Sequence, residues 1–151
     1  MDVCLRKQLI VTCEAKCINI WNYVTKKLEI SQPTGAGEEA AAVAFHPSGF
    51  HLVVAYGDKI QFMNVLSSSI KEYNQIPLKQ CRELSFSPGG HYLACGVQAS
   101  MIFVYNFYTM ECPSHQQLRG HLNRVRCIDW FEDDSGFASC AQDGTAYCFD
   151  L

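Results

Sequence analysis

The feature that most constrains the fold is a unit that recurs about every 42 residues and closes on an apolar or aromatic residue followed by Asn or Asp. The closing pairs begin at Trp21, Met63, Tyr105 and Phe149, at intervals of 42, 42 and 44 residues. A period of this length is typical of four-stranded sheets that stack as propeller blades, because one such sheet cannot bury its faces alone. The repeat predicts stacked sheets and favours a binding surface, since nothing that recurs in it is reactive.

Within each unit, apolar residues alternate with a period of two, which indicates strands. Turns rich in Pro, Gly, Ser and Asp separate these strands, as at 46–49 and 87–90. We expect first strands at 1–4, 43–45, 84–86 and 128–130, second strands at 9–13, 52–56, 93–97 and 137–141, third strands at 18–21, 60–63, 102–105 and 146–149, and outer strands at 27–31, 70–73 and 116–118.

The expected fold is therefore all-β, a partial propeller of about four four-stranded blades. The sequence given stops at Leu151, directly after the last third strand, so we expect the last blade to lack its outer strand. The repeats span approximately 1–31, 40–73, 81–118 and 125–151. Open blade faces and an unpaired strand edge favour association, so we expect that the isolated chain is not a stable closed monomer.

Charge and composition exclude several classes of partner. The 151 residues carry a net charge of −3, with 48% hydrophobic and 18% charged residues, which is typical of a folded domain. Lys and Arg form no long cluster, so we expect no nucleic-acid partner. The chain has no long apolar run and no signal-peptide pattern at its start. We therefore expect a soluble intracellular chain with no membrane partner.

The nine cysteines show no pattern of a metal or redox site. They lie at positions 4, 13, 17, 81, 95, 112, 127, 140 and 148, without a C-x-x-C pair. Cys13, Cys95 and Cys140 occupy equivalent second strands, where a thiol serves as a small buried hydrophobe. We interpret the cysteines as reduced core residues, and we expect no metal and no other cofactor.

The remaining reactive side chains have structural explanations. No G-x-S-x-G elbow is present, and the acidic turn 132–134 is expected to be solvated. Strands do not lower the pKa of a thiol, so an enzyme with a Cys nucleophile is only a distant alternative to a non-enzymatic chain. The large aromatic residues of the repeats are expected to point inward between blades, and they are Trp21, Phe45, Phe62, Phe86, Tyr105, Trp130 and Phe149.

The last unit resembles a WD40 repeat. Gly120-His121 precedes a strand, Ser139 lies on the next strand, Asp143 follows in a turn, and Phe149 stands where the family usually has Trp. The resemblance implies a hydrogen-bonded string of His, Ser, Asp and Trp, with His121 and Asp143 in direct reach. Phe149 has no N–H, so the string would end at Ser139. The first repeat keeps the Trp of the motif as Trp21.

Longer segments resemble the large WD-repeat cilia- and flagella-associated proteins of axonemes. These segments are 9–23, 81–94, 118–130 and 143–151. The resemblance implies a non-catalytic scaffold in the cytoplasm and in the axoneme of a cilium or flagellum, active in inner dynein arm assembly or regulation. Its partners would be dynein-arm or doublet-microtubule components. The alternative is a WD40 adaptor of another cytoplasmic complex, such as a ubiquitin-ligase or trafficking assembly.

The partner surface is expected where loops enter the first strands and join second to third strands. These loops share one face of a propeller, and their side chains are free of packing duties. The predicted residues of this loop face are Lys16, Glu39, Asp58, Lys59, Gln80, Gln98 and Arg124. Their mixed charge favours a protein partner over a polyanion.

Overall fold

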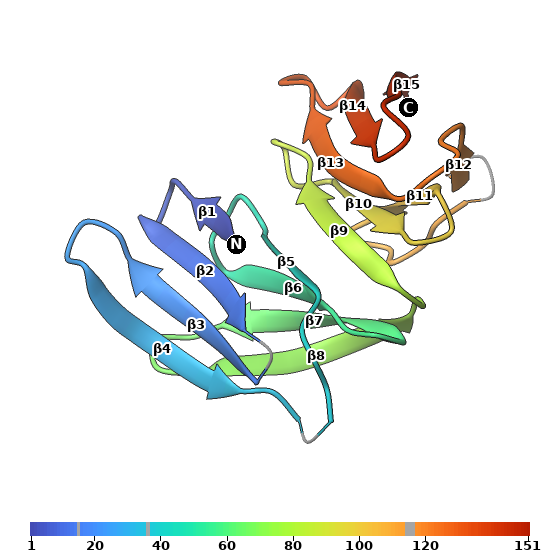
Figure 1. Cartoon of the computed structure of the whole chain (residues 1–151). Coiled ribbons are helices and arrows are strands. Elements are labelled where there is room, and N and C mark those ends of the chain that lie inside the picture. Colours follow the sequence, from blue (N-terminus) through green and yellow to red (C-terminus); the bar gives the residue numbers. More distant parts are fainter. Residues whose placement is uncertain (15, 36, 114–116) are drawn as a thin grey trace. The chain divides into compact units, whose positions relative to one another are not determined.

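The computed structural model describes residues 1–14, 16–35, 37–113 and 117–151 (Figure 1). The described residues form two compact units, Met1–Lys79 and Gln80–Leu151, each with two antiparallel sheets. In this part of the chain, no helix is long and apolar enough to cross a membrane.

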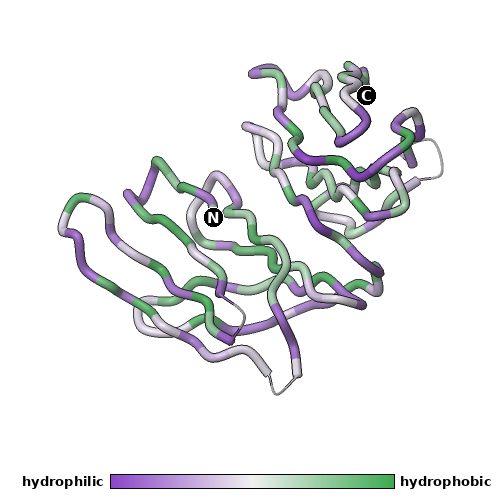
Figure 2. The backbone as a smooth tube through the Cα atoms, viewed as in Figure 1, coloured by the Kyte–Doolittle hydropathy of each residue, from purple (hydrophilic) through white to green (hydrophobic). Residues whose placement is uncertain are grey.

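The first unit contains two four-stranded sheets whose strands pair in chain order. The first sheet is formed by β1 (Asp2–Cys4), β2 (Leu9–Glu14), β3 (Cys17–Asn22) and β4 (Lys27–Pro33). The second sheet is formed by β5 (Ala42–Phe45), β6 (His51–Ala55), β7 (Lys59–Val65) and β8 (Ile70–Pro77). Figure 2 shows mostly hydrophilic colouring along the outer strand β8 and apolar colouring along β6, in line with their exposed and buried residues.

The two sheets of the first unit share an apolar core and two polar ties. Val11 and Ile20 of the first sheet and Leu52 and Val54 of the second are fully buried in one cluster. The backbone N–H of Phe45 donates to Asp2 Oδ2 at 2.7 Å, and that of Ile70 donates to Gln32 Oε1 at 3.0 Å. Side chains of the first sheet thus satisfy strand groups of the second, as buried backbone requires.

The second unit contains one four-stranded and one three-stranded sheet. The four-stranded sheet consists of β9 (Cys81–Phe86), β10 (Tyr92–Val97), β11 (Met101–Asn106) and β12 (Gln117–Arg119). The three-stranded sheet consists of β13 (Val125–Trp130), β14 (Gly136–Ala141) and β15 (Ala146–Asp150). Position 116, where the sequence places the start of an outer strand, lies outside the described residues.

Trp130 joins the two sheets of the second unit. Its indole stacks on Tyr92 at a centroid distance of 6.2 Å, and its Nε1–H donates to the carbonyl of Ser85 at 3.2 Å. Phe137, which is fully buried, packs against the same indole. The aromatic ring supplies buried area while its polar N–H finds a partner, the usual requirement for a buried Trp.

These sheets confirm the all-β class and the blade pattern, including the missing outer strand of the last blade. The inward placements of Trp21 and of three cysteines were wrong. Trp21 is 38% exposed, because Ile10 and Trp21 pair on the face of the first sheet away from Val11 and Ile20. Cys127, Cys140 and Cys148 are exposed, because all three lie on the face of the last sheet opposite its core.

Candidate functional site

The last sheet holds a string of polar side chains around His121. Both ring nitrogens of this buried His contact hydroxyl groups, Nδ1 with Thr145 Oγ1 at 2.8 Å and Nε2 with Ser139 Oγ at 2.7 Å. Thr145 Oγ1 also contacts Asp143 Oδ1 at 2.6 Å. The expected direct bond between His121 and Asp143 was therefore wrong, because Thr145 stands between them and occupies the ring nitrogen.

The carboxylate of Asp143 fixes the direction of these bonds. It can only accept, so the single hydroxyl proton of Thr145 points to Asp143. Thr145 must then accept from His121 Nδ1–H, and in the neutral ring Nε2 accepts from the Ser139 hydroxyl. Asp143 Oδ2 also accepts from the backbone N–H of Leu122 at 2.7 Å. These donors, chiefly the Thr145 hydroxyl and then the Thr145 and Leu122 backbone, lower the pKa of Asp143 to about 2.

Phe149 continues the site by packing alone. Its ring lies 5.4 Å from Phe137 and 6.2 Å from Tyr147, between centroids. Ser139 receives no N–H from this position, since Phe has none. Sequence reasoning missed Thr145, although an Asp in a turn commonly accepts from the backbone N–H two residues on, as Asp143 does from Thr145 here.

The predicted loop face divides between the two units. In the first unit, Lys16, Glu39 and Asp58 are exposed, and Lys59 is half-buried. The carbonyl of Lys16 accepts from Thr34 N–H at 2.9 Å, and that of Asp58 accepts from Leu78 N–H at 3.2 Å. Only their backbones are used in these bonds, which leaves the two side chains available to a partner.

Lys59 belongs to a charged cluster that the sequence did not reveal. Its Nζ lies 2.6 Å from Glu38 Oε1 and 5.8 Å from the ring centroid of the buried Tyr56. The hydrogen bond with Glu38 raises the pKa of Lys59. Burial, and then the charges of Glu38 and Glu72, raise the pKa of Tyr56 to about 12. Glu38 was missed because its neighbour Glu39 fits the loop pattern equally well.

In the second unit, backbone bonds hold the predicted loops. Gln98 N–H donates to the carbonyl of Gln80 at 3.0 Å, and both side chains are exposed. The carbonyl of Arg124 accepts from Gln142 N–H at 2.9 Å. Arg124 itself is half-buried, and its Nε is buried without a hydrogen-bond partner among the described residues. Arg124 is therefore a less accessible contact than the sequence indicated.

The acidic turn of the last blade is not simply solvated. Asp134 reaches the neighbouring turn and accepts from Ser87 Oγ at 3.1 Å and from Gly89 N–H at 2.9 Å. Asp133 instead bonds Ser135 within its own turn. Among the described residues, no group of three or more His, Cys, Asp and Glu side chains is placed to hold a metal ion.

Residues 112–150 match the family described as "WD40: WD domain, G-beta repeat". The four blade-like sheets agree with this match. The chain contains a WD40 repeat domain. A chain in the crystal structure of the mitotic checkpoint complex superposes with a TM-score of 0.81 at 18% identity, over 99% of this chain and 47% of that one, which supports the fold alone.

The WD40 chain is homologous to cilia- and flagella-associated protein 57 over most of its length. Identity is 46% to protein 57 A of Tetrahymena thermophila over 145 residues, which cover 95% of this chain and 11% of the relative. Identity to protein 57 of Mus musculus is 36% over 152 residues, covering 100% of this chain and 12% of the relative. The chain thus spans about a tenth of the length of these relatives.

Proposed function

We propose that the WD40 chain is a non-catalytic protein-interaction scaffold of the cytoplasm and of the ciliary or flagellar axoneme, active in inner dynein arm assembly or regulation. Its homology to cilia- and flagella-associated protein 57 supports the location. The observation that carries the binding role is the loop face, where exposed side chains of both charges extend from loops fixed by backbone bonds. Rigid loops lose little entropy on binding, which favours recognition.

The chemistry of the loop face favours a protein partner. Lys16 and Asp58 carry opposite charges in two neighbouring blades of the first unit, and Lys59 pairs with Glu38 close by. A polyanion would meet repulsion at Asp58 and Glu38, whereas a protein surface can match both signs. We propose dynein-arm or doublet-microtubule components as partners, and neither nucleic acid nor membrane.

The test is capture of a dynein-arm component from axonemal extract by the immobilised chain. Lys16→Glu and Asp58→Lys together should lower capture at least about tenfold, since close charge pairs are worth about 1.5 kcal/mol or more at interfaces. Lys71→Glu with Glu72→Lys, on the exposed outer strand β8, is the matched charge control and should capture as the unchanged chain does.

Thermal unfolding of all three proteins should coincide, because the substituted side chains are exposed. Equal capture by the doubly reversed chain would contradict the loop-face assignment. Specific enrichment of ubiquitin-ligase or trafficking subunits, with no dynein-arm component, would contradict the axonemal assignment and favour an adaptor of another complex.

A further inference from the structure

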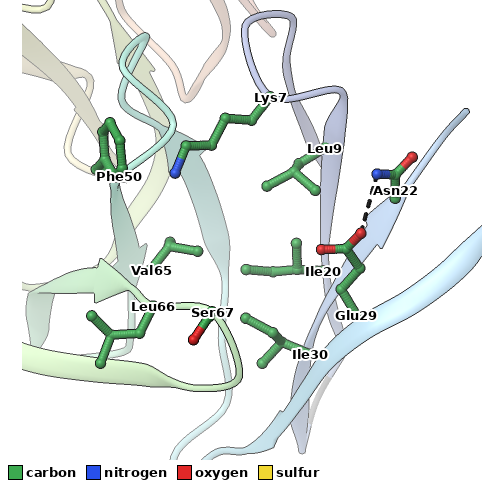
Figure 3. A pocket seen from close by; sticks show the side chains of 10 residues that line it. All are labelled: Lys7, Leu9, Ile20, Asn22, Glu29, Ile30, Phe50, Val65, Leu66 and Ser67. Carbon is green, nitrogen blue, oxygen red and sulfur yellow. Dashed lines mark hydrogen bonds between the residues drawn. The ribbon is translucent and has the colours of Figure 1, made fainter.

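A hollow of about 490 Å³ lies at the end of the first unit where its hairpin turns contribute Lys7, Phe50, Leu66 and Ser67 to the lining (Figure 3). Its apolar lining comes from both sheets: Leu9, Ile20, Ile30 and Val65 form the floor and are at most 7% exposed, whereas Phe50 and Leu66 are exposed. The volume is within the range of roughly 300–1,000 Å³ that is usual for ligand pockets. An apolar lining supplied by two sheets suits an apolar group.

Lys7 places a positive charge at one side of the hollow. Its Nζ lies 3.4 Å from the centroid of the Phe50 ring, a cation–π contact. The stem of Lys7 runs over Gly49, where a Cβ would come within 2.9 Å of Lys7 Cγ and Cδ. A glycine at this position, with φ of +74°, therefore leaves the space that the Lys7 stem occupies.

Glu29 places a negative charge at the other side of the hollow (Figure 3). Asn22 Nδ2 donates to Glu29 Oε1 at 3.1 Å and so orients the carboxylate. Among the described residues, neither Lys7 nor Glu29 has an ion-pair partner. The hollow thus presents two oriented charges of opposite sign on either side of apolar walls.

The hairpin turns of the first unit expose apolar side chains beyond those that line the hollow. Each of the four hairpin turns at this end exposes at least one large apolar side chain, although turns are usually polar. The most exposed one in each turn is Leu5 (80% exposed), Val24 (57%), Phe50 (57%) or Leu66 (44%). A molecule that only filled the hollow would leave Leu5 and Val24 in water, whereas a protein surface would cover them. Apolar patches of this kind mark protein contacts.

We propose that the hollow, together with the exposed apolar side chains of the four turns, forms a groove that binds a short protein segment. This segment carries one large apolar side chain, which enters the hollow, and has an acidic residue on one side of it and a basic residue on the other. The acidic residue pairs with Lys7, and the basic residue pairs with Glu29. The proposal rests on the scaffold function but assigns a second contact, on the opposite end of the blades from the loop face. Glu29 disfavours nucleic acid, and the two signs together favour a segment of mixed charge.

The test uses a random 12-residue peptide library on phage, selected on the immobilised full chain. Enriched peptides should share a large apolar residue flanked by one acidic and one basic residue. Leu66→Asp should lower the affinity for a selected synthetic peptide at least tenfold, as measured by fluorescence anisotropy. Leu28→Asp is the matched control, because Leu28 is equally exposed at 45% but pairs with Trp21 on the other face of the sheet.

Charge reversal gives the sharper result. Lys7→Glu should lower the affinity for the selected peptide at least tenfold. A peptide whose acidic residue is replaced by Lys should bind this variant with most of the lost affinity restored. Absence of any enriched peptide, or equal binding to Leu66→Asp, would overturn the proposal. A dimer that Leu66→Asp abolishes would also overturn it, because the groove would then bind a second copy of the chain. Binding of anilinonaphthalene sulfonate without binding of any peptide would overturn it too, because the hollow would then be a site for a small apolar molecule.

The two proposals fail separately. If the loop face alone is wrong, Lys16→Glu with Asp58→Lys leaves both axonemal capture and peptide binding unchanged. If the groove alone is wrong, the same double variant still lowers axonemal capture, while the peptide selection yields nothing that depends on Leu66.

Discussion

At the scale of single residues, the bonds around His121 form a chain that runs from the Ser139 hydroxyl to the Asp143 carboxylate. Each donor points towards the negative charge, so each bond polarises the next. Ser139 is 2% exposed and His121 is 6% exposed, which keeps water from replacing either partner. Loss of one member therefore leaves a buried polar atom unsatisfied.

Ser139→Ala tests this dependence. Removal of the hydroxyl leaves His121 Nε2 buried without its donor, and we expect the free energy of unfolding to fall by about 1–3 kcal/mol. Urea denaturation followed by Trp fluorescence measures the change. Ser135→Ala is the control, since its hydroxyl bonds Asp133 at the surface and should matter by less than about 0.5 kcal/mol. Equal losses in both variants would contradict the role of the string.

The lowered pKa of Asp143 predicts a pH dependence. Its folded pKa, about 2, lies below the usual 3.8, so the carboxylate favours the folded chain above pH 4. That contribution is lost as the pH falls from about 4 through about 2, because protonation then removes the acceptor of the Thr145 and Leu122 donors. Asp143→Asn should lower the urea midpoint at pH 5 and flatten its decline below pH 4. Parallel curves for both proteins would refute this assignment.

The sequence predicted part of this site and missed part for a physical reason. His121 and Ser139 lie at motif positions set by strand register, so their contact could be expected. Thr145 was missed because its role depends on the path of the turn after Asp143, and a regular strand pattern contains no record of that path. At Trp21 the sequence was misleading instead. The residue occupies the motif position of the family's Trp, but its ring is partly exposed.

At the scale of elements, the hairpin turns of neighbouring blades lock together in the second unit. Asp134 accepts from Ser87 and Gly89 of the adjacent turn, and its carboxylate also lies 3.4 Å from His91 Nδ1. Gly89 permits this approach, because a Cβ there would overlap Asp134 Oδ2. The strands of each blade were predictable from alternation, but this lock was not, since it joins two turns 45 residues apart.

Gly89→Ala should break the hydrogen bonds between Asp134 and the adjacent turn. The added methyl must displace the Asp134 carboxylate, and we expect a loss of about 1–3 kcal/mol, which is typical for a disrupted polar contact. Gly57→Ala is the matched control, because nothing lies within 4 Å of a Cβ at that position. Calorimetry should show a lower Tm for the first variant and little change for the second. In an Asp134→Ala background, Gly89→Ala should add little, and a full additive loss would contradict the mechanism.

At the scale of the whole molecule, the last sheet has an edge that nothing in the described residues covers. The strand β15 pairs with β14 along one side only, and Tyr147 and Cys148 on it are exposed. Unpaired N–H and C=O groups on such an edge can pair with another chain. Alternation of apolar residues in the sequence predicts the three strands that pair in this sheet.

We therefore expect the isolated chain to associate reversibly through β15. Sedimentation velocity in reducing buffer should give a weight-average mass that rises with concentration. Cys148→Lys places a charge on the free edge and should return the chain to a monomer, because edge lysines oppose strand pairing. Cys148→Ser removes the same thiol without adding charge, and should associate as the unchanged chain does. A monomer at every concentration in the unchanged chain would refute edge pairing, and loss of association in the Ser variant would assign it to the thiol.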